Sequence, residues 1–337
     1  MPVSVALIGA NGAGKTTLHT ALTGGRGHDG VGMVDVPDER LWRLSAAVHP
    51  KKTTPAQVRL VDSPPGSPAQ RIAAAREADV VVQVVRCFGP AADPVAELEQ
   101  LSVDLVLTDL ATVEKRLDVV GKELRVGRKE RAVEAEALEA ARAHLDAGRP
   151  LRSLRLEPEQ APQLEPIFAV SRKPIVVVAN VGDEQLPDGG GQAGKVRSAA
   201  AGQGASTLVV CAQLEAELAE LDPAEAGPLR ESYGLAEGGL DRIARAVWAS
   251  GGLITYFTAG EPEARAWPCE QGAPAPVAAG VIHSDFERHF IRAEVTSVDE
   301  FVSAGSMEAL RAAGKLRVEG RDYRVQDGDV VFFRIGR

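Results

Sequence analysis

Residues 9–16 read GANGAGKT, which matches the Walker A pattern G-x-x-x-x-G-K-[ST] at each of its fixed positions. The apolar run VSVALI precedes the motif, and residues 16–23 continue as a predicted helix. A strand, a glycine-rich loop and a helix in that order form the context in which this motif binds phosphate. The motif therefore predicts a nucleotide-binding loop on a parallel α/β sheet.

The residue types of this loop suit a nucleotide bound with magnesium. Backbone N–H groups from Asn11 to Lys15 would surround the β-phosphate, and the N-terminus of the following helix adds partial positive charge. Lys15 would bridge the β- and γ-phosphates and is an expected catalytic residue, while the Thr16 hydroxyl would bind Mg²⁺. We expect the nucleotide-binding residues of the loop to be Asn11, Gly12, Ala13, Gly14, Lys15, Thr16 and Thr17.

Asp62 ends a second apolar run and is the expected second magnesium ligand, acting through a water molecule. The alternative is a turn-forming aspartate ahead of SPPG. The wording NGAGKTTL is also typical of transporter ATPases, which would place a glutamate after this aspartate and carry an LSGGQ-like signature. Ser63 follows Asp62 and no such signature occurs, which excludes the transporter class.

Apolar runs at residues 56–62, 78–88, 173–181 and 205–213 have the same character as the first run. They alternate with helical stretches, which predicts a parallel sheet with crossover helices. Residues 183–194, DEQLPDGGGQAG, are expected to form an exposed, flexible loop.

A heptad seam follows the third of these runs. Its apolar residues recur at alternating spacings of four and three, and they are Val106, Leu110, Val113, Leu117, Val120 and Leu124. Leu138, Ala141 and Leu145 continue the period on a returning helix. The pattern predicts an antiparallel helical arm inserted into the sheet domain, with two ordinary surface helices as the alternative.

The sequence pattern changes again from Leu253 onward. Short segments typical of β-strands are interrupted there by helical stretches near residues 275–290 and 298–313. Asp327-Gly328 is a hairpin turn signal. A small mixed α+β domain fits this pattern. The expected domains are an NTPase domain at residues 1–105 and 172–250, an arm at 106–171 and a C-terminal domain at 251–337.

NVGD at residues 180–183 is a candidate base-reading motif. In GTPases, N-K-x-D supplies an asparagine that braces the phosphate loop and an aspartate that accepts from guanine N1–H and N2–H₂. Asn180 and Asp183 fill those positions, while Val181 replaces the lysine. A polar turn at the end of a strand is the alternative for so short a match.

Composition indicates a soluble cytoplasmic protein. A net charge of −9 argues against a protein that coats nucleic acid over its whole surface, and we expect no DNA partner. The three cysteines include no CxxC pair, which excludes a disulfide framework and makes a zinc site unexpected. No signal peptide or membrane span is expected, and therefore no membrane partner.

With these motifs assembled, the sequence resembles the YchF family, the Obg-like ATPases. The resemblance runs along the chain and is most specific in GLITYFTAGEPEARAW, AAGVIHSDFERHFIRAEV and GKLRVEGRDYRVQDGDVVFFR. It implies a P-loop domain with an inserted helical arm and a C-terminal TGS domain, a ubiquitin-like β-grasp. It further implies slow ATP hydrolysis, weaker use of GTP and association with ribosomes.

The resemblance also places base contacts at Cys211, Ala212 and Gln213, which match the family's CAK segment except that Gln213 replaces lysine. Asp183 stands where the family has glutamate, a residue linked to its ATP preference. ATP is favoured by resemblance, and GTP stays open.

Two departures from the family concern hydrolysis. The segment after the first helix is short and lacks the family's magnesium-binding threonine, and the loop after Asp62 is shortened. Pro65 has no N–H to offer the γ-phosphate, so Gly66 is the expected catalytic donor. Thr53 and Thr54 are weighed as replacement magnesium ligands against a role as ordinary strand-entry residues. We expect nucleotide binding with slow or absent hydrolysis.

The tip of the arm has a local charge of 5 − 2 = +3 between residues 122 and 131. Its basic residues are expected to meet ribosomal RNA phosphate, together with the TGS-like domain, unless they form a solvated helix end. These residues are Lys122, Arg125, Arg128, Lys129 and Arg131. The hypothesis is a nucleotide-dependent switch on the ribosome. The alternative is a hydrolysis-deficient scaffold that regulates a protein partner.

Overall fold

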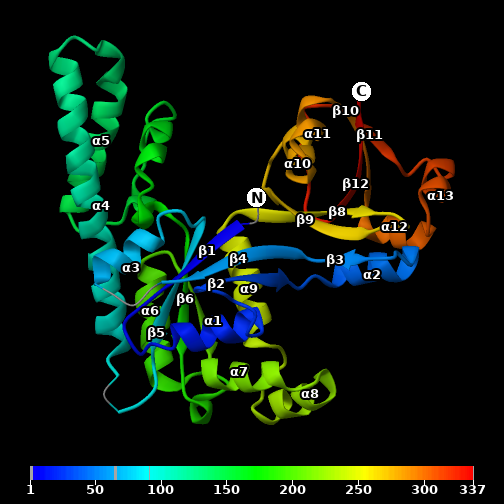
Figure 1. The fold of residues 1–337 in the computed structure, drawn as a ribbon, viewed down its shortest axis with the longest axis horizontal. Helices are drawn as coiled ribbons and strands as arrows, with labels where there is room; N and C mark the ends of the chain where they lie inside the picture. Colours follow the sequence, from blue (N-terminus) through cyan, green and yellow to red (C-terminus); the bar gives the residue numbers. More distant parts are fainter. Residues whose placement is uncertain (1–2, 64–66, 91, 337) are drawn as a thin grey trace. The chain divides into compact units, whose positions relative to one another are not determined.

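A six-stranded sheet carries the Walker A loop (Figure 1), with strand order β2-β4-β1-β5-β6-β7. The computed structural model describes residues 3–63, 67–90 and 92–336. The strands β1, β5, β6 and β7 are parallel neighbours, as the sequence predicted. The strand bounds are β1 (Val3–Ile8), β2 (Val31–Val36), β4 (Ala56–Asp62), β5 (Val80–Arg86), β6 (Ile175–Asn180) and β7 (Ser206–Val210).

The central strands are buried on both faces. Every residue of β6 is buried, and so is all of β5 except Arg86, because helices cover a parallel sheet on each side. This explains why both strands are rich in valine. The helices that accompany this sheet along the chain are α1 (Lys15–Thr23), α3 (Pro68–Ala74), α4 (Pro94–Arg125), α6 (Gly190–Gly202), α7 (Ala212–Glu220), α8 (Pro223–Ser232) and α9 (Gly239–Ser250).

The expectation of a flexible loop at residues 183–194 is wrong in its second half. Helix α6 begins at Gly190 and buries Ala193, Val196 and Ala200 along one face. Those residues recur at helical spacing and lie in the core of the sheet domain. Burial of this face outweighs the low helix propensity of the glycines.

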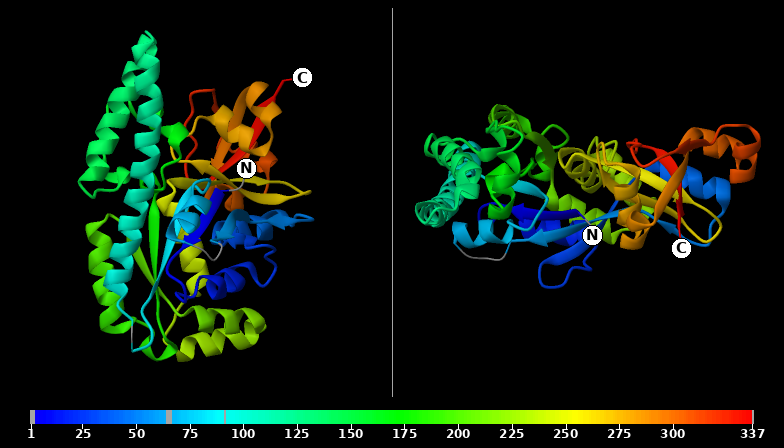
Figure 2. Two further views of the ribbon diagram at one scale, coloured as in Figure 1. Left: turned by 60° about the vertical axis from the view of Figure 1, so that its left-hand side comes forward. Right: turned by 90° about the horizontal axis from the view of Figure 1, so that it is seen from above.

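The predicted arm is an antiparallel pair made by the outer part of α4 and by α5 (Ala132–Asp146), which lie side by side in the views of Figures 1 and 2. Helix α4 begins at Pro94, well before residue 106. Its residues Leu98 and Leu105 belong to the core of the sheet domain. From Val106 onward its buried residues pack instead with Leu138 and other residues of the returning helix. Helix α4 therefore contributes core residues both to the sheet domain and to the arm.

The C-terminal part contains a second six-stranded sheet, with order β11-β10-β12-β8-β9-β3. Its strands are β3 (Thr53–Thr54), β8 (Leu253–Ala259), β9 (Ala264–Glu270), β10 (Phe290–Ser297), β11 (Arg317–Glu319) and β12 (Asp329–Ile335). The helices of this part are α2 (Glu39–Val48), α10 (Ala275–Ile282), α11 (Ser284–Arg288), α12 (Val298–Ala304) and α13 (Met307–Ala312).

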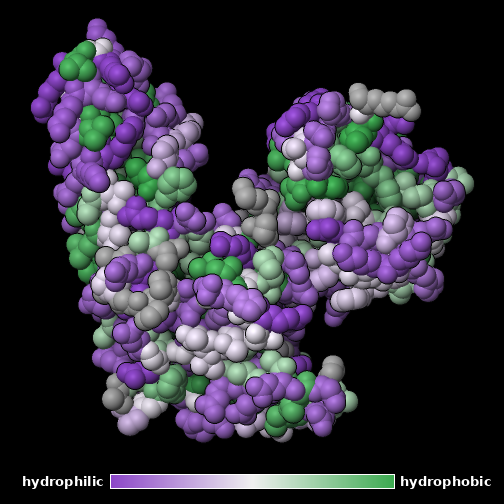
Figure 3. All heavy atoms as spheres, viewed as in Figure 1, coloured by the Kyte–Doolittle hydropathy of each residue, from purple (hydrophilic) through white to green (hydrophobic). Residues whose placement is uncertain are grey.

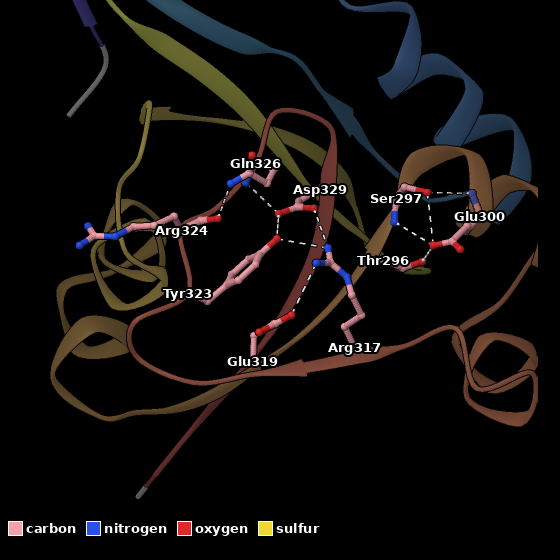
Figure 4. Close-up of polar contacts among 9 residues, drawn as sticks. All are labelled: Thr296, Ser297, Glu300, Arg317, Glu319, Tyr323, Arg324, Gln326 and Asp329. Atoms are coloured by element: carbon pink, nitrogen blue, oxygen red, sulfur yellow. Dashed lines mark hydrogen bonds and ion pairs between the residues drawn. The ribbon is translucent and has the colours of Figure 1, made fainter.

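Asp327-Gly328 forms a turn, but the predicted hairpin is wrong. The strand that follows, β12, pairs with β10 and β8, and β11 pairs with β10. The turn instead leads the chain into β12, whose first residue, Asp329, is buried. Asp329 accepts hydrogen bonds from the Tyr323 hydroxyl at 2.6 Å and from the Gln326 N–H at 2.9 Å (Figure 4). These bonds satisfy a carboxylate that burial alone would disfavour.

The chain divides into two compact units. One holds residues 4–33 and 59–243, and the other holds residues 34–58 and 244–336 with Val3. Residues 34–58 were assigned to the NTPase domain from the sequence, so this grouping differs from the predicted division. The physical reason is the packing of α2 and β3: Arg40 on α2 pairs with Asp327 at 2.6 Å, and β3 pairs with β9. In the described part of the chain, no helix is long and apolar enough to cross a membrane.

Candidate functional site

The Walker A loop joins the end of β1 to the start of α1, and glycine is required at two of its positions. A Cβ at Gly9 would overlap the backbone oxygen of Val84, and a Cβ at Gly14 would overlap Nδ2 of Asn180. Gly14 also has a φ of +91°. The loop therefore packs closely against β5 and β6, and this packing gives it its curvature.

Lys15 lies over the loop that it follows. Its Nζ donates hydrogen bonds to the backbone oxygens of Gly9, at 3.1 Å, and Ala10, at 2.9 Å. Only 9% of the residue is exposed. Burial lowers the pKa of Lys15, and the nearby Asp62 carboxylate opposes that effect. An ammonium so placed is partly dehydrated, which strengthens its attraction for a phosphate oxygen.

Thr16 and Asp62 form the candidate magnesium site. The Thr16 hydroxyl donates to Oδ2 of Asp62 at 2.8 Å, although the two residues come from different strand–helix units. Oδ1 of Asp62 is buried and has no hydrogen-bond partner among the described residues. Hard oxygen ligands with one atom left unsatisfied fit Mg²⁺, which binds proteins through few oxygens and keeps several waters.

Asn180 braces the phosphate loop from the end of β6. Its Nδ2 donates to the backbone oxygen of Ala13 at 2.9 Å, and its Oδ1 accepts from the N–H of Ala212 at 2.9 Å. The side chain is buried, at 4% exposure, and both of its polar ends are satisfied. One residue thus holds the loop and the start of α7 in register, as the N-x-x-D interpretation expected of this asparagine.

A cavity of about 410 Å³ opens beside the loop, at the ends of β6 and β7. Eight of the residues predicted from the sequence line it: Gly14, Thr17, Asn180, Val181, Asp183, Cys211, Ala212 and Gln213. Asn11, Gly12, Ala13, Lys15 and Thr16 belong to the loop itself. The structure brings these residues together, and their roles toward a nucleotide stay predictions.

The cavity also contains residues that the sequence did not single out. They include Phe88 and Gly89 after β5, Glu184, Glu217 on α7, and Tyr233 after α8. The strand signal at residues 78–88 could have pointed to Phe88, because parallel strands end at one edge of the sheet. No local signal marks Tyr233, which follows Asp183 by fifty positions.

Known proteins show the same sequence pattern. Residues 253–336 match the family model YchF-GTPase_C, which is described as a protein of unknown function (DUF933). The chain is 36% identical over 363 residues to the ribosome-binding ATPase YchF of Bacillus subtilis, covering 99% of each chain. The chain belongs to the YchF family. The ribosome-binding ATPase YchF of Escherichia coli O157:H7 is 34% identical, covering 97% of each chain.

A solved YchF structure has the same fold. The Schizosaccharomyces pombe YchF GTPase has a TM-score of 0.87 to this chain at 23% identity, covering 98% of this chain and 97% of that one. The likeness confirms the predicted fold class, a P-loop sheet domain with a C-terminal sheet domain. It also confirms the resemblance on which the sequence interpretation drew.

The contacts of Thr53 and Thr54 favour the alternative of ordinary strand-entry residues over a magnesium-binding role. The hydroxyl of Thr53 hydrogen-bonds with that of Ser45 at 2.6 Å, and the hydroxyl of Thr54 donates to Glu263 at 2.5 Å. Both threonines serve the sheet that contains β3 and β9, as strand-entry residues do. Gly66 and Pro65 lie outside the described residues.

Two charged residues near the loop were not anticipated. Arg71 on α3 donates to Oδ1 of Asn11 at 3.3 Å. Glu97 on α4 accepts from the N–H of Arg86 at 3.4 Å, and burial raises the pKa of its carboxyl group.

Cys211 is a buried thiol whose pKa is raised, again chiefly by burial. It therefore forms part of the cavity wall and is not a reactive thiolate.

The arm tip keeps only part of its predicted free charge. Glu123 pairs with Arg131 at 2.8 Å and with Arg128 at 3.4 Å. Among the described residues, no ion pair is found for Lys122, Arg125 or Lys129. Figure 3 shows the outer end of the arm as mostly hydrophilic with isolated hydrophobic residues.

Proposed function

We propose that this chain is a purine nucleoside triphosphate-binding switch that takes ATP, with GTP as the weaker ligand, and that hydrolyses it slowly. The observation that carries the proposal is the Thr16–Asp62 pair at the mouth of the Walker A loop. Oδ2 of Asp62 is 2.8 Å from the Thr16 hydroxyl, and its Oδ1 is buried without a partner. A Mg²⁺ ion bound to a nucleotide would supply that partner.

Each nearby residue has a defined task in this proposal. Backbone N–H groups of residues 11–15 surround the phosphates, Lys15 neutralises the charge that develops on them, and Asn180 holds the loop in position. The bound Mg²⁺ supplies electrostatic stabilisation of the phosphoryl group. Val181, Asp183, Cys211, Ala212 and Gln213 form the base end of the cavity.

Calorimetric titration with ATP and with GTP, in the presence and absence of Mg²⁺, tests the binding. We expect Lys15→Ala to abolish it and Thr16→Ala to remove its magnesium dependence. Thr20→Ala is the matched control, because Thr20 is an exposed threonine one turn further along α1. Binding that survives in Lys15→Ala, or that is independent of Mg²⁺ in the unaltered protein, would contradict the proposal.

Slow turnover follows from the side chains between α1 and β4. Residues 24–58 contain three hydroxyl groups, on Ser45, Thr53 and Thr54. All three form hydrogen bonds to one another or to Glu263, within the unit that holds the C-terminal sheet. No hydroxyl group of this segment is therefore free to act as a further Mg²⁺ ligand near the γ-phosphate. Less charge stabilisation in the transition state means slower hydrolysis.

This same observation favours a second candidate function, a nucleotide-binding scaffold that regulates a protein partner without hydrolysis. Single-turnover phosphate release separates the two functions. Release that is lost in Lys15→Ala supports the slow enzyme. Intact binding with no release above the Lys15→Ala background supports the scaffold.

The proposed partner is the ribosome, which the bacterial relatives, called ribosome-binding ATPases, bind according to their names. Two features of this chain support the proposal. Lys122, Arg125 and Lys129 on the arm have no ion pair with any residue that the structure describes, and they would meet RNA phosphate. The C-terminal unit, proposed as a TGS domain, would provide the second contact surface. The soluble, cytoplasmic location expected from the sequence belongs to the same proposal.

A further inference from the structure

Tyr233 lies at the base end of the 410 Å³ cavity, directly after helix α8. Its hydroxyl donates a hydrogen bond to Oδ2 of Asp183 at 3.5 Å. Gly14 and Thr17 of the phosphate loop line the same cavity. A nucleotide whose phosphates occupy the loop would therefore present its base toward the pair of Tyr233 and Asp183.

The position of the tyrosine hydroxyl is set by packing. The ring of Tyr233 is partly buried and packs against the core of the sheet domain, alongside Leu186 and Leu229. A packed ring has two side-chain torsions and little freedom, so its hydroxyl is held near Asp183 at small entropic cost. The neighbouring carboxylate Asp183 also contributes to raising the pKa of Tyr233, after burial, so the phenol keeps its proton and can donate.

A carboxylate alone and a carboxylate with a phenol present different patterns to a purine. Asp183 alone accepts two hydrogen bonds, which suits the N1–H and the 2-amino group of guanine. Tyr233 changes this pattern. Its single O–H donates to Oδ2 in this structure, and when it turns from Oδ2 to a base it provides a donor beside the carboxylate acceptor. The Watson–Crick edge of adenine has the complementary arrangement, with a 6-amino donor beside an N1 acceptor.

We propose that Tyr233 is a specificity-determining residue of this nucleotide site: its hydroxyl donates to N1 of adenine while Asp183 accepts from the 6-amino group. Guanine carries a hydrogen at N1 and an oxygen at C6, so it opposes both groups of the pair. Both bases break the hydrogen bond between Tyr233 and Asp183, but only adenine offers the Tyr233 O–H an acceptor at N1 in its place. This inference rests on the proposed binding of a nucleotide and names the residue that selects its base.

The test uses the full chain and three nucleotides, with affinities measured by calorimetry in Mg²⁺: ATP, GTP and 1-deaza-ATP, in which a C–H replaces the N1 acceptor. In the unaltered protein we expect 1-deaza-ATP to bind about fivefold more weakly than ATP, as the loss of one hydrogen bond to a neutral group implies. Tyr233→Phe should bind ATP about fivefold more weakly and should no longer distinguish ATP from 1-deaza-ATP. Its affinity for GTP should stay the same or rise.

Ser232→Ala is the matched control, because Ser232 is the adjacent exposed residue and its hydroxyl donates to the backbone oxygen of Leu229. This variant should behave as the unaltered protein does. An equal loss of affinity for ATP and GTP in Tyr233→Phe would show a structural role and overturn the inference. Equal binding of ATP and 1-deaza-ATP by the unaltered protein would overturn it even if Tyr233→Phe failed to fold.

The two proposals fail in different ways. If neither triphosphate binds the unaltered protein, or if Lys15→Ala binds as well as it does, the nucleotide site itself is wrong. If binding is intact and depends on Lys15, but the ratio of the ATP and GTP affinities is the same with Tyr233 and with phenylalanine, only the specificity role is wrong.

Discussion

Gly14 combines a φ of +91° with a Cα that faces the side-chain amide of Asn180. Each of these features would penalise any other residue, but by different mechanisms. The backbone conformation costs an L-residue about 1–2 kcal/mol. The close approach to Asn180 would add a steric clash between the new Cβ and a side chain from a different strand. The neighbouring Gly12 separates the two effects, because its φ is +78° and a Cβ there would meet nothing within 4 Å.

We therefore expect Gly12→Ala to lower the free energy of unfolding by about 1 kcal/mol, from backbone strain alone. Gly14→Ala should lower it by about 3 kcal/mol, because the added methyl also displaces Asn180 from the backbone oxygen of Ala13. Urea unfolding followed by circular dichroism measures both values. Equal losses in the two variants would show that contact with Asn180 does not stabilise the loop.

Residue identity also sets the base preference expected at Asp183. The sequence assigned this carboxylate to the base, and the structure places it in the cavity beside Tyr233. Asp183→Glu extends the carboxylate by one methylene and restores the residue that the family resemblance implies. Competition of ATP against GTP should shift toward ATP in this variant. An unchanged ratio would mean that the residue at position 183 does not contact the base.

In the helical arm, the residues that the heptad pattern marks as apolar are the ones that pack between the two helices. Val120 on α4 is fully buried in the arm core, while the adjacent Val119 is 41% exposed. Both residues are valines, and they are adjacent on the same helix. They differ in which face of the helix they occupy, and the heptad period predicts that difference.

Val120→Ala should lower the free energy of unfolding by about 2 kcal/mol, because it removes buried methyl groups and leaves a cavity. Val119→Ala should change it by less than about 0.5 kcal/mol. Chemical denaturation of both variants measures the difference. A loss at Val119 equal to that at Val120 would contradict the seam.

A buried glutamate in the C-terminal sheet forms ion pairs with arginine side chains. The buried carboxylate of Glu294 on β10 pairs with Arg334 at 3.0 Å and with Arg311 at 3.1 Å. The hydrogen bonds from these arginines, Arg334 first, lower the pKa of Glu294 below its usual 4.5. A lowered pKa in the folded state means that the ionised form stabilises the fold.

The contribution of Glu294 should be complete above its unfolded pKa and disappear as the pH falls through its lowered folded pKa. Glu294→Gln should therefore melt at a lower temperature than the unaltered protein at pH 7, and the gap should close toward pH 3. Glu308→Gln on α13 is the control, because the side chain of Glu308 has no ion pair among the described residues. A gap that stays constant with pH would show that charge at Glu294 does not stabilise the sheet.

The whole molecule presents an acidic chain with a basic tip on its arm. Of the five cations there, Arg128 and Arg131 are paired with Glu123. Lys122, Arg125 and Lys129 have no ion pair within the described ranges, and these three are the proposed contacts to a partner. Contact with RNA phosphate releases counterions, so affinity for a ribosome should fall as salt rises. The prediction concerns the intact chain, because the arm acts at a distance from the nucleotide site along α4.

Arg125→Glu combined with Lys129→Glu should weaken cosedimentation with ribosomes and reduce its dependence on salt. Lys195→Glu combined with Arg197→Glu is the matched control, since it changes the net charge equally on the exposed face of α6. Circular dichroism shows whether each variant is folded. Cosedimentation that is unaffected at the tip, or affected equally by both pairs, would remove the arm from the proposed interface.

The sequence alone determined the features that depend on near neighbours. The Walker A loop, the valine-rich strands and the arm seam all follow from glycine conformation, apolar runs or a repeat of seven, which act over a few residues. The strand β2 was missed although residues 31–36 alternate in burial, because the run VGMVDV is weakly apolar. The glycines at residues 189–191 hid the start of α6 for a related reason: local propensity and tertiary burial disagree there.

Only the tertiary structure decided which distant groups meet. It placed Tyr233 against Asp183 and Arg71 against Asn11, and it grouped residues 34–58 with the C-terminal sheet. Local patterns set the conformation of a segment, but they contain no record of which segments pack together. That choice depends on the order of strands in the sheet and on which buried surfaces fit, and both belong to the folded chain as a whole.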